Sequence, residues 1–110
     1  MRALSIRQPY AEEILRGIKT IEYRTRSTQI IGKRFYIYAP KLPAVGEEKR
    51  FAKLGCELGD LPVGVLVGTA KIARCTGEPP NCEWHLTDVK RLKHPRKPKR
   101  MPQPVWFTPF

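Results

Sequence analysis

The chain has 110 residues, enough for one domain with a modest core. Its 41% hydrophobic and 28% charged residues are typical of a soluble globular protein, and its longest apolar run, residues 63–67, is too short to cross a membrane. The 21 basic and 10 acidic residues give a net charge of +11, which favours an anionic polymer as the partner, most simply a nucleic acid. The alternative is a solvated basic tail that only aids solubility.

The first 24 residues predict a strand, a short helix and a second strand. Leu4 and Ile6 alternate with polar residues, as is typical of a half-buried strand. Pro9 suits the first position of a helix, and Gly17 suits the residue that ends it. The apolar stripe of this helix consists of Ala11, Ile14, Leu15 and Ile18. Its outer face is predicted to carry Glu12, Glu13 and Arg16.

The middle of the chain predicts a strand, a helix and a second, central strand. Residues 34–39 place aromatic rings on both faces, which indicates a strand that is covered on both sides or borders a cleft. Residues 45–58 are predicted to form a helix that Gly59 ends. Residues 63–74 begin apolar on both faces, so this strand is expected in the centre of the sheet. Within it, Gly68 marks a bulge or a close backbone approach.

The last third of the chain predicts a loop, two strands and an arm. Residues 76–81 are expected to be a loop and residues 82–92 a strand. Four prolines then exclude a helix or a central strand, so residues 90–104 are expected to form a basic, proline-rich arm. Residues 105–107 could return as an edge strand. In total, about five to six strands with two helices predict an α+β fold in a single domain, residues 1–110.

A polar row on the second strand carries the most informative side chains. Thr20, Glu22 and Arg24 share one face of this strand, and Lys19 directly precedes it. A carboxylate between two cations can accept a hydrogen bond from an exocyclic amine, and an arginine offers a planar fork to a phosphate or a base edge. The alternative is an ordinary row of salt bridges on a solvated face, worth at most about 1 kcal/mol per pair.

Two further candidates lie where the first helix begins. The free N–H groups at this end of a helix can bind an anion next to Gln8. Tyr10 can stack on a nucleobase, a contact worth about 1–3 kcal/mol. The alternatives are that Gln8 caps the helix and that Tyr10 packs in the core.

The cysteines and histidines predict neither a disulfide framework nor a metal site. The three cysteines are odd in number and lack C-x-x-C spacing. Cys75, Cys82 and His85 resemble half of a zinc site, but a structural site needs four ligands and only Cys56 and His94 remain. No secretory signal is visible, so a cytoplasmic protein is expected. No phosphate-binding loop or dinucleotide fingerprint is present, and we expect no cofactor.

The first 24 residues also carry a family resemblance. The run S-I-x-Q-P-Y-A at residues 5–11, followed by I-L-x-G-x-K-T-I-E-x-R at residues 14–24, resembles the opening of the ASCH domain, the activating signal cointegrator homology module. The resemblance continues almost to the end of the chain, where Trp106 matches the family's terminal tryptophan. Two departures are Tyr10, where the family usually has Trp, and the lack of glycine in the basic segment. The resemblance implies a PUA-like small β-barrel.

The leading functional interpretation is an ASCH domain that binds RNA or another single-stranded nucleic acid. The resemblance places the family's site near Lys19 and its neighbours, so one nucleotide is expected in a polar cleft there. The phosphate backbone would follow basic side chains of the arm: Lys93, Arg96, Lys97, Lys99 and Arg100. A small nucleoside is the other expected ligand, no membrane partner is expected, and the oligomeric state is left open.

An enzyme is the rival interpretation. Some ASCH-like proteins are amidohydrolases that deacetylate N(4)-acetylcytidine, and others are nucleases. The resemblance would make Lys19 the catalytic lysine, but the amidohydrolases' catalytic threonine falls at Glu22. Thr20 is nearby without being the matched position, and a further catalytic glutamate has only Glu78 and Glu83 as candidates. An adaptor that binds proteins is a third, weaker alternative.

Overall fold

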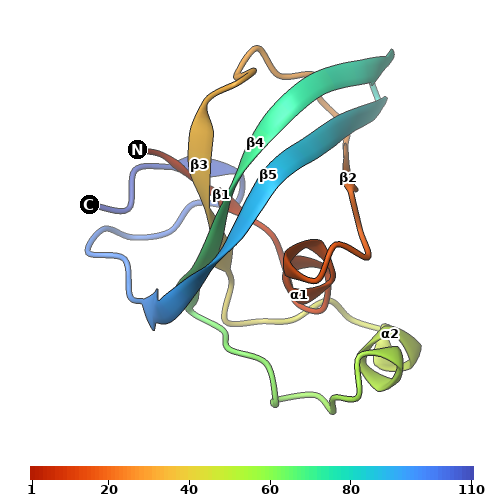
Figure 1. The fold of residues 1–110 in the computed structure, drawn as a ribbon, viewed down its shortest axis with the longest axis vertical. Helices are drawn as coiled ribbons and strands as arrows, with labels where there is room; N and C mark the ends of the chain where they lie inside the picture. The colour runs from red at the N-terminus through yellow and green to blue at the C-terminus, as the bar shows by residue number, and fades with distance from the viewer.

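The protein consists of one six-stranded sheet and two short helices, and the computed structural model describes residues 1–110 (Figure 1). The strands are β1 (Ala3–Ser5), β2 (Ile21–Arg24), β3 (Arg34–Ala39), β4 (Val65–Glu78), β5 (Asn81–Arg96) and β6 (Trp106–Phe107). Helix α1 (Tyr10–Leu15) connects β1 to β2, and helix α2 (Glu48–Lys53) lies between β3 and β4. The predicted α+β class is confirmed. Neither helix is long and apolar enough to span a membrane.

The strand order in the sheet is β2-β5-β4-β3-β1-β6. Only β1 and β3 run parallel, and all other neighbours are antiparallel. The β4–β5 pair is a long twisted ribbon that crosses the molecule diagonally, while α1 lies against β5 and α2 lies away from the sheet (Figure 1). Because β2 and β6 are the two edges and do not pair with each other, the sheet is open and the barrel is not closed.

Strands β1 and β3 bury side chains on both faces, as the aromatic alternation of residues 34–39 indicated. The main core combines them with α1, β4 and β5, and its buried members are Leu4, Ile6, Ala11, Ile14, Phe35, Ile37, Ala39, Val67, Ala70, Ile72, Cys82 and Trp84. A smaller cluster on the other face consists of Ala3, Tyr38, Leu66 and Phe107. The C-terminal strand β6 therefore contributes to the interior through the second cluster.

The prediction for Gly68 is confirmed. Next to Gly68, the pairing register of β4 shifts against both of its neighbouring strands, β3 and β5. A Cβ atom on Gly68 would lie 2.5 Å from a methyl carbon of Leu15 and 2.7 Å from the carbonyl oxygen of Lys90. Only glycine leaves room for α1 and β5 to approach this strand so closely.

Three predicted element boundaries are wrong. Helix α2 ends at Lys53, because Gly55 adopts a φ of 74° and takes the terminating role expected of Gly59. Residues 76–78 and residue 81 belong to the β4–β5 hairpin rather than to a loop. Strand β5 continues past the predicted end at residue 92 to Arg96, so the extended arm begins at Lys97, and below "the arm" means residues 97–104.

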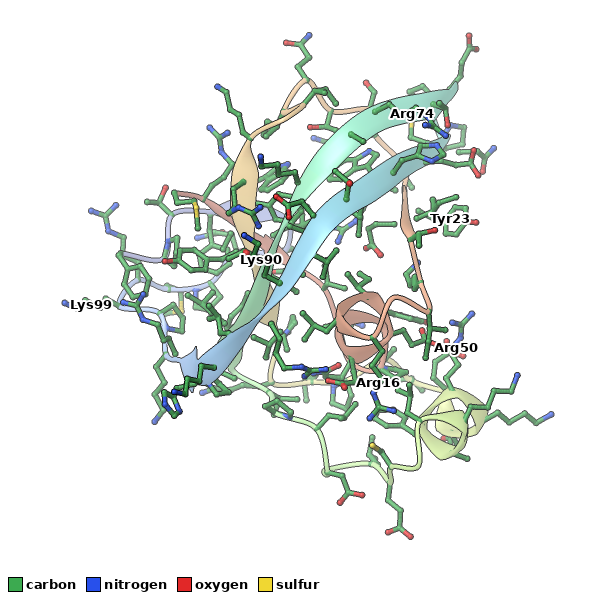
Figure 2. The ribbon with its side chains drawn as sticks, viewed as in Figure 1. Arg16, Tyr23, Arg50, Arg74, Lys90 and Lys99 are labelled. Atoms are coloured by element: carbon green, nitrogen blue, oxygen red, sulfur yellow. The ribbon has the colours of Figure 1, made fainter.

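The two glutamates on the polar face of α1 are buried, contrary to the prediction that they point outward, whereas Arg16 is exposed as predicted. Glu12 is 4% exposed and Glu13 is 7% exposed. Glu12 accepts two hydrogen bonds from Arg91 of β5, at 2.9 and 2.8 Å, and one from Arg16 at 2.7 Å. Glu13 accepts a hydrogen bond from Arg50 of α2 at 2.9 Å. Figure 2 shows Arg16 and Arg50 in the space between the two helices.

This burial has a simple physical reason. Packing between β5 and α2 leaves the short helix α1 little solvated surface, and arginines from both neighbours supply the partners that buried carboxylates need. The predicted apolar stripe of α1 is too long, because Ile18 lies beyond the C-terminal end of the helix and is 63% exposed. Burial acts to raise the pKa of Glu12, but the hydrogen bonds from Arg91 and Arg16 outweigh it and the pKa is lowered.

We predict that Glu12→Gln destabilises the fold by about 1–3 kcal/mol at neutral pH, because the charge-assisted hydrogen bonds to two arginines are lost. The lowered pKa means that the unfolded chain binds this proton more readily. The contribution of Glu12 is therefore complete above its usual pKa of 4.5 and is lost as the pH falls below that value.

Urea unfolding of the wild type and the variant between pH 3 and pH 7 measures this difference. The matched control is Glu48→Gln, since Glu48 is exposed and forms no ion pair. A Glu12→Gln penalty that is the same at both ends of the pH range would contradict the expected role of the carboxylate.

Candidate functional site

Three residues of the predicted polar row meet at one carboxylate, that of Glu22. Strand β2 turns Glu22 inward, where it is 8% exposed, and turns the neighbouring Tyr23 outward. One carboxylate oxygen, Oε2, lies 2.7 Å from Nη2 and 2.9 Å from Nε of Arg24. The other oxygen, Oε1, faces Nζ of Lys19 at 3.5 Å. Because Glu22 is buried, this is not a row of salt bridges on a fully solvated face.

The guanidinium group of Arg24 is held by residues from two other strands, β1 and β5. Its Nη2 donates a hydrogen bond to the carbonyl oxygen of Ser5 in β1 at 2.8 Å. Its Cζ lies 5.6 Å from the ring centroid of Trp84 in β5, and Trp84 stacks on Trp106 of β6 with ring centroids 5.9 Å apart. The third nitrogen, Nη1, has no protein partner and remains available as a donor.

Glu22 and Arg24 line a cleft of about 670 Å³, a volume within the range of small-molecule sites. Aromatic and apolar side chains form much of the lining, together with a few polar groups. The residues that line it are Ser5, Arg7, Tyr10, Glu22, Tyr23, Arg24, Tyr38, Pro40, Lys41, Leu42, Met101, Pro102, Gln103 and Pro104. Lys19 lies behind this lining, where its Nζ also donates to the carbonyl oxygen of Ile21.

One wall of the cleft is the end of the arm, residues 101–104. The hydroxyl of Ser5 donates to the carbonyl oxygen of Gln103 at 2.6 Å, and the N–H of Ser5 donates to the carbonyl oxygen of Val105 at 3.0 Å. The sequence reasoning missed this wall, because the prolines suggested a segment free of the sheet. It also missed Arg7 and Lys41, although the rings of residues 34–39 had indicated a bordering cleft.

Tyr10 lies at the cleft in a fixed orientation. Its hydroxyl donates to the carboxylate of Glu47 at 2.6 Å, and this hydrogen bond raises the pKa of Tyr10. The ring centroid lies 5.8 Å from Nζ of Lys19 and 5.4 Å from Cζ of Arg50. With the hydroxyl engaged elsewhere, the ring is the part of Tyr10 that the cleft can use.

Besides Lys19, two predicted residues of the site do not line the cleft. Gln8 is 1% exposed, and both ends of its amide are engaged: Nε2 donates to the carbonyl oxygen of Pro62, and Oε1 accepts from the backbone N–H of Glu12. Gln8 therefore caps α1, which is the alternative interpretation of this residue. Thr20 is exposed, and its carbonyl oxygen accepts a hydrogen bond from the N–H of Leu86.

The predicted basic residues divide between β5 and the arm, and all five are exposed. Lys93 and Arg96 lie on β5, and Arg96 places its Cζ 4.3 Å from the ring centroid of Phe110. In the arm, the backbone N–H groups of Lys99 and Arg100 both donate to the carbonyl oxygen of Pro109. The arm is thus fastened through its backbone while its cationic side chains stay in solvent. Figure 2 shows Lys99 projecting on the side of the molecule opposite to Tyr23.

The cysteines and histidines are dispersed. Cys75 is opposite Trp84 in the β4–β5 pair, and Cys82 is opposite Gly77. His85 makes a 2.7 Å contact with the hydroxyl of Thr76 through Nε2. No group of three or more His, Cys, Asp or Glu side chains is arranged to hold a metal ion. Burial raises the pKa of the fully buried Cys82 thiol, which suits a packing role.

The ASCH domain family model matches residues 4–101, a range that includes the cleft-forming segments β1, α1 and β2. The chain belongs to the ASCH domain family, as its opening motif indicated. No curated protein matches the chain.

We predict that a strong chelator leaves the thermal unfolding of the protein unchanged, because the potential ligands Cys75, Cys82 and His85 do not converge. Differential scanning calorimetry with and without EDTA measures this. A melting temperature several degrees lower with EDTA would mean that a metal ion contributes to the fold.

Proposed function

We propose that the protein binds RNA, or another single-stranded nucleic acid, in the cytoplasm, with one nucleotide held in the cleft and the phosphate backbone on the arm. The observation that carries this proposal is the convergence of Lys19 and Arg24 on the Glu22 carboxylate at the cleft. Membership of the ASCH domain family is consistent with binding RNA or with a related function.

The two groups at the cleft offer an acceptor beside a donor. Oε1 of Glu22 has lone pairs free to accept a hydrogen bond, since its one charged neighbour lies 3.5 Å away. Nη1 of Arg24 is a free donor on a guanidinium that cannot turn away. An acceptor next to a donor fits a base that carries an exocyclic amine beside a ring nitrogen, as cytosine and adenine do.

A single strand suits this cleft better than a duplex. A base must leave a stacked helix to place its edge against Glu22, and single-stranded or looped RNA presents such bases already. The rings of Tyr10 and Tyr23 line the same cleft and give a base aromatic surface to pack against. The cationic residues of the arm are followed along the chain by the cleft wall at Met101. Because Lys99 projects on the side of the molecule opposite to Tyr23 (Figure 2), a strand that contacts both would wrap around the arm.

An enzyme that acts on acetylated cytidine is less well supported. Glu22 occupies the position of the amidohydrolases' threonine, and Thr20 does not line the cleft. Glu78 and Glu83, the candidates for the further catalytic glutamate, do not line it either. Lys19 nevertheless contacts a carboxylate, the minimum that proton transfer at this cleft would need.

We predict that affinity for single-stranded RNA falls with salt by about 0.7 log units per phosphate contacted, for each tenfold rise in salt. Changing Lys97, Lys99 and Arg100 to Ala should reduce this slope by up to about 2 log units. Fluorescence anisotropy with an oligoribonucleotide at 50–500 mM salt measures the slope.

Arg96 is kept in that variant, because its contact with Phe110 would confound the result. The control is Lys49→Ala with Lys53→Ala, two exposed cations on α2. An unchanged slope in the triple variant would show that the arm does not contribute to affinity.

We predict no release of acetate from acetylcytidine by the wild type, and a modest loss of RNA affinity, about three- to tenfold, in Lys19→Met. If the cleft instead catalysed amide hydrolysis, Lys19 would take part in proton transfer, which contributes about 10²–10⁴-fold. Glu22→Gln, which keeps the shape and removes the charge, should change the preference among bases. Turnover that disappears in Lys19→Met would establish the enzyme.

A further inference from the structure

We propose that Arg7 and Lys41 form a phosphate subsite at the cleft, so that its ligand is a nucleotide recognised through its own phosphate rather than a bare nucleoside. The inference rests on the proposed function, because it concerns the same cleft. It adds a second group of ligand-binding residues. Arg7 and Lys41 follow β1 and β3, whereas Glu22 and Arg24 lie on β2.

The two residues follow adjacent strands, those of the one parallel pair in the sheet. In the β1–β3 register, Ser5 is opposite Tyr38. The hydrogen bond from the N–H of Ile6 to the carbonyl oxygen of Tyr38, at 2.8 Å, continues this pairing beyond the end of β1. Arg7 and Lys41 therefore follow the carboxyl ends of two adjacent parallel strands, and both line the cleft.

The charges of these two residues are uncompensated. Neither residue forms a salt bridge, and neither side chain donates a hydrogen bond to the protein. The only carboxylate that lines the cleft is that of Glu22, which already has Arg24 and Lys19 as partners. Two cations without a counter-charge, at a cleft whose one carboxylate is already paired, favour the binding of an anion.

The position of Lys41 is partly fixed by a glycine. Gly64 has a φ of 72°, and its N–H donates to the carbonyl oxygen of Ala39 at 2.6 Å. A Cβ atom at this position would lie 3.1 Å from Cγ of Lys41 and 3.5 Å from its Cε. The stem of Lys41 therefore passes over Gly64, which restricts the orientations of the ammonium group beside the cleft.

With this subsite, the cleft contains one group of residues for the base of a nucleotide and another for its phosphate. Glu22 and Arg24 present hydrogen-bonding groups to a base edge, whereas Arg7 and Lys41 present only donors and positive charge. An arginine can bind a phosphate with two parallel hydrogen bonds, and a lysine adds a mobile point charge. A nucleoside would occupy the first element alone, and a nucleotide would occupy both.

The test compares the affinities of cytidine, 5′-CMP and 3′-CMP for the full-length chain by isothermal titration calorimetry at low salt. We expect at least one monophosphate to bind about tenfold or more tightly than cytidine, as charge-assisted hydrogen bonds to a phosphate imply. The 5′ and 3′ arms identify which phosphate is used. The same series with adenosine and its monophosphates covers the other amino base.

The decisive variant is Arg7→Gln with Lys41→Gln, and the control is Lys49→Gln with Lys53→Gln. We expect the first to abolish the preference for the monophosphate while leaving cytidine affinity within about twofold, and the second to keep the preference. Equal binding of cytidine and both monophosphates in the wild type would overturn the subsite, as would a preference that survives in the decisive variant.

Different results would contradict the phosphate subsite and the proposed function. A protein that binds an oligoribonucleotide but shows no gain from the monophosphates lacks the subsite and retains the proposed function. A protein that binds neither the oligoribonucleotide nor any monomer lacks both.

Discussion

The arrangement of the molecule depends on the pairing of the buried Glu12 carboxylate with Arg91. Helix α1 has only six residues, too few to be stable without its contacts, yet it joins β1 to β2 and sets the direction in which both strands leave it. The bidentate contact at 2.9 and 2.8 Å fastens this helix to β5. Tyr10 begins the helix and Lys19 follows it closely, so the geometry of the cleft depends on where this one carboxylate is held.

The cleft is organised before any ligand arrives. Ser5 and Trp84 fix the guanidinium of Arg24, and Arg24 in turn holds the carboxylate of Glu22. Groups fixed in this way need little ordering on binding, and the ordering of side chains is one of the costs that reduce affinity. By contrast, Lys97 and the other cations of the arm are exposed and free to adapt, as contacts to a flexible phosphate backbone require.

Local sequence patterns predicted many of the strands and helices. They failed where contacts between residues far apart in the sequence determine the structure. The alternation predicted the strands β1 and β2, and the strand geometry of Glu22 and Arg24 predicted that they meet. It did not predict which faces are buried, because Ser5 is buried as well as Leu4, and Glu22 lies inward while Tyr23 is exposed. The burial of Glu12 could not be predicted, because its partner Arg91 lies 79 residues away in the sequence. The end of β5 was missed because Pro95 suggested a break. That part of β5 has β4 on one side only, where a missing N–H is tolerated.

The hydrogen bond between Ser5 and Gln103 joins residues that are 98 positions apart in the sequence. This separation determines when the cleft is completed during synthesis of the chain. A ribosome that has just released Arg24 has delivered the carboxylate and the arginine of the cleft, but not the wall that faces them. That wall emerges about seven-tenths of a chain length later. The cleft is therefore incomplete on the emerging chain, and it closes on this side only when synthesis is nearly finished.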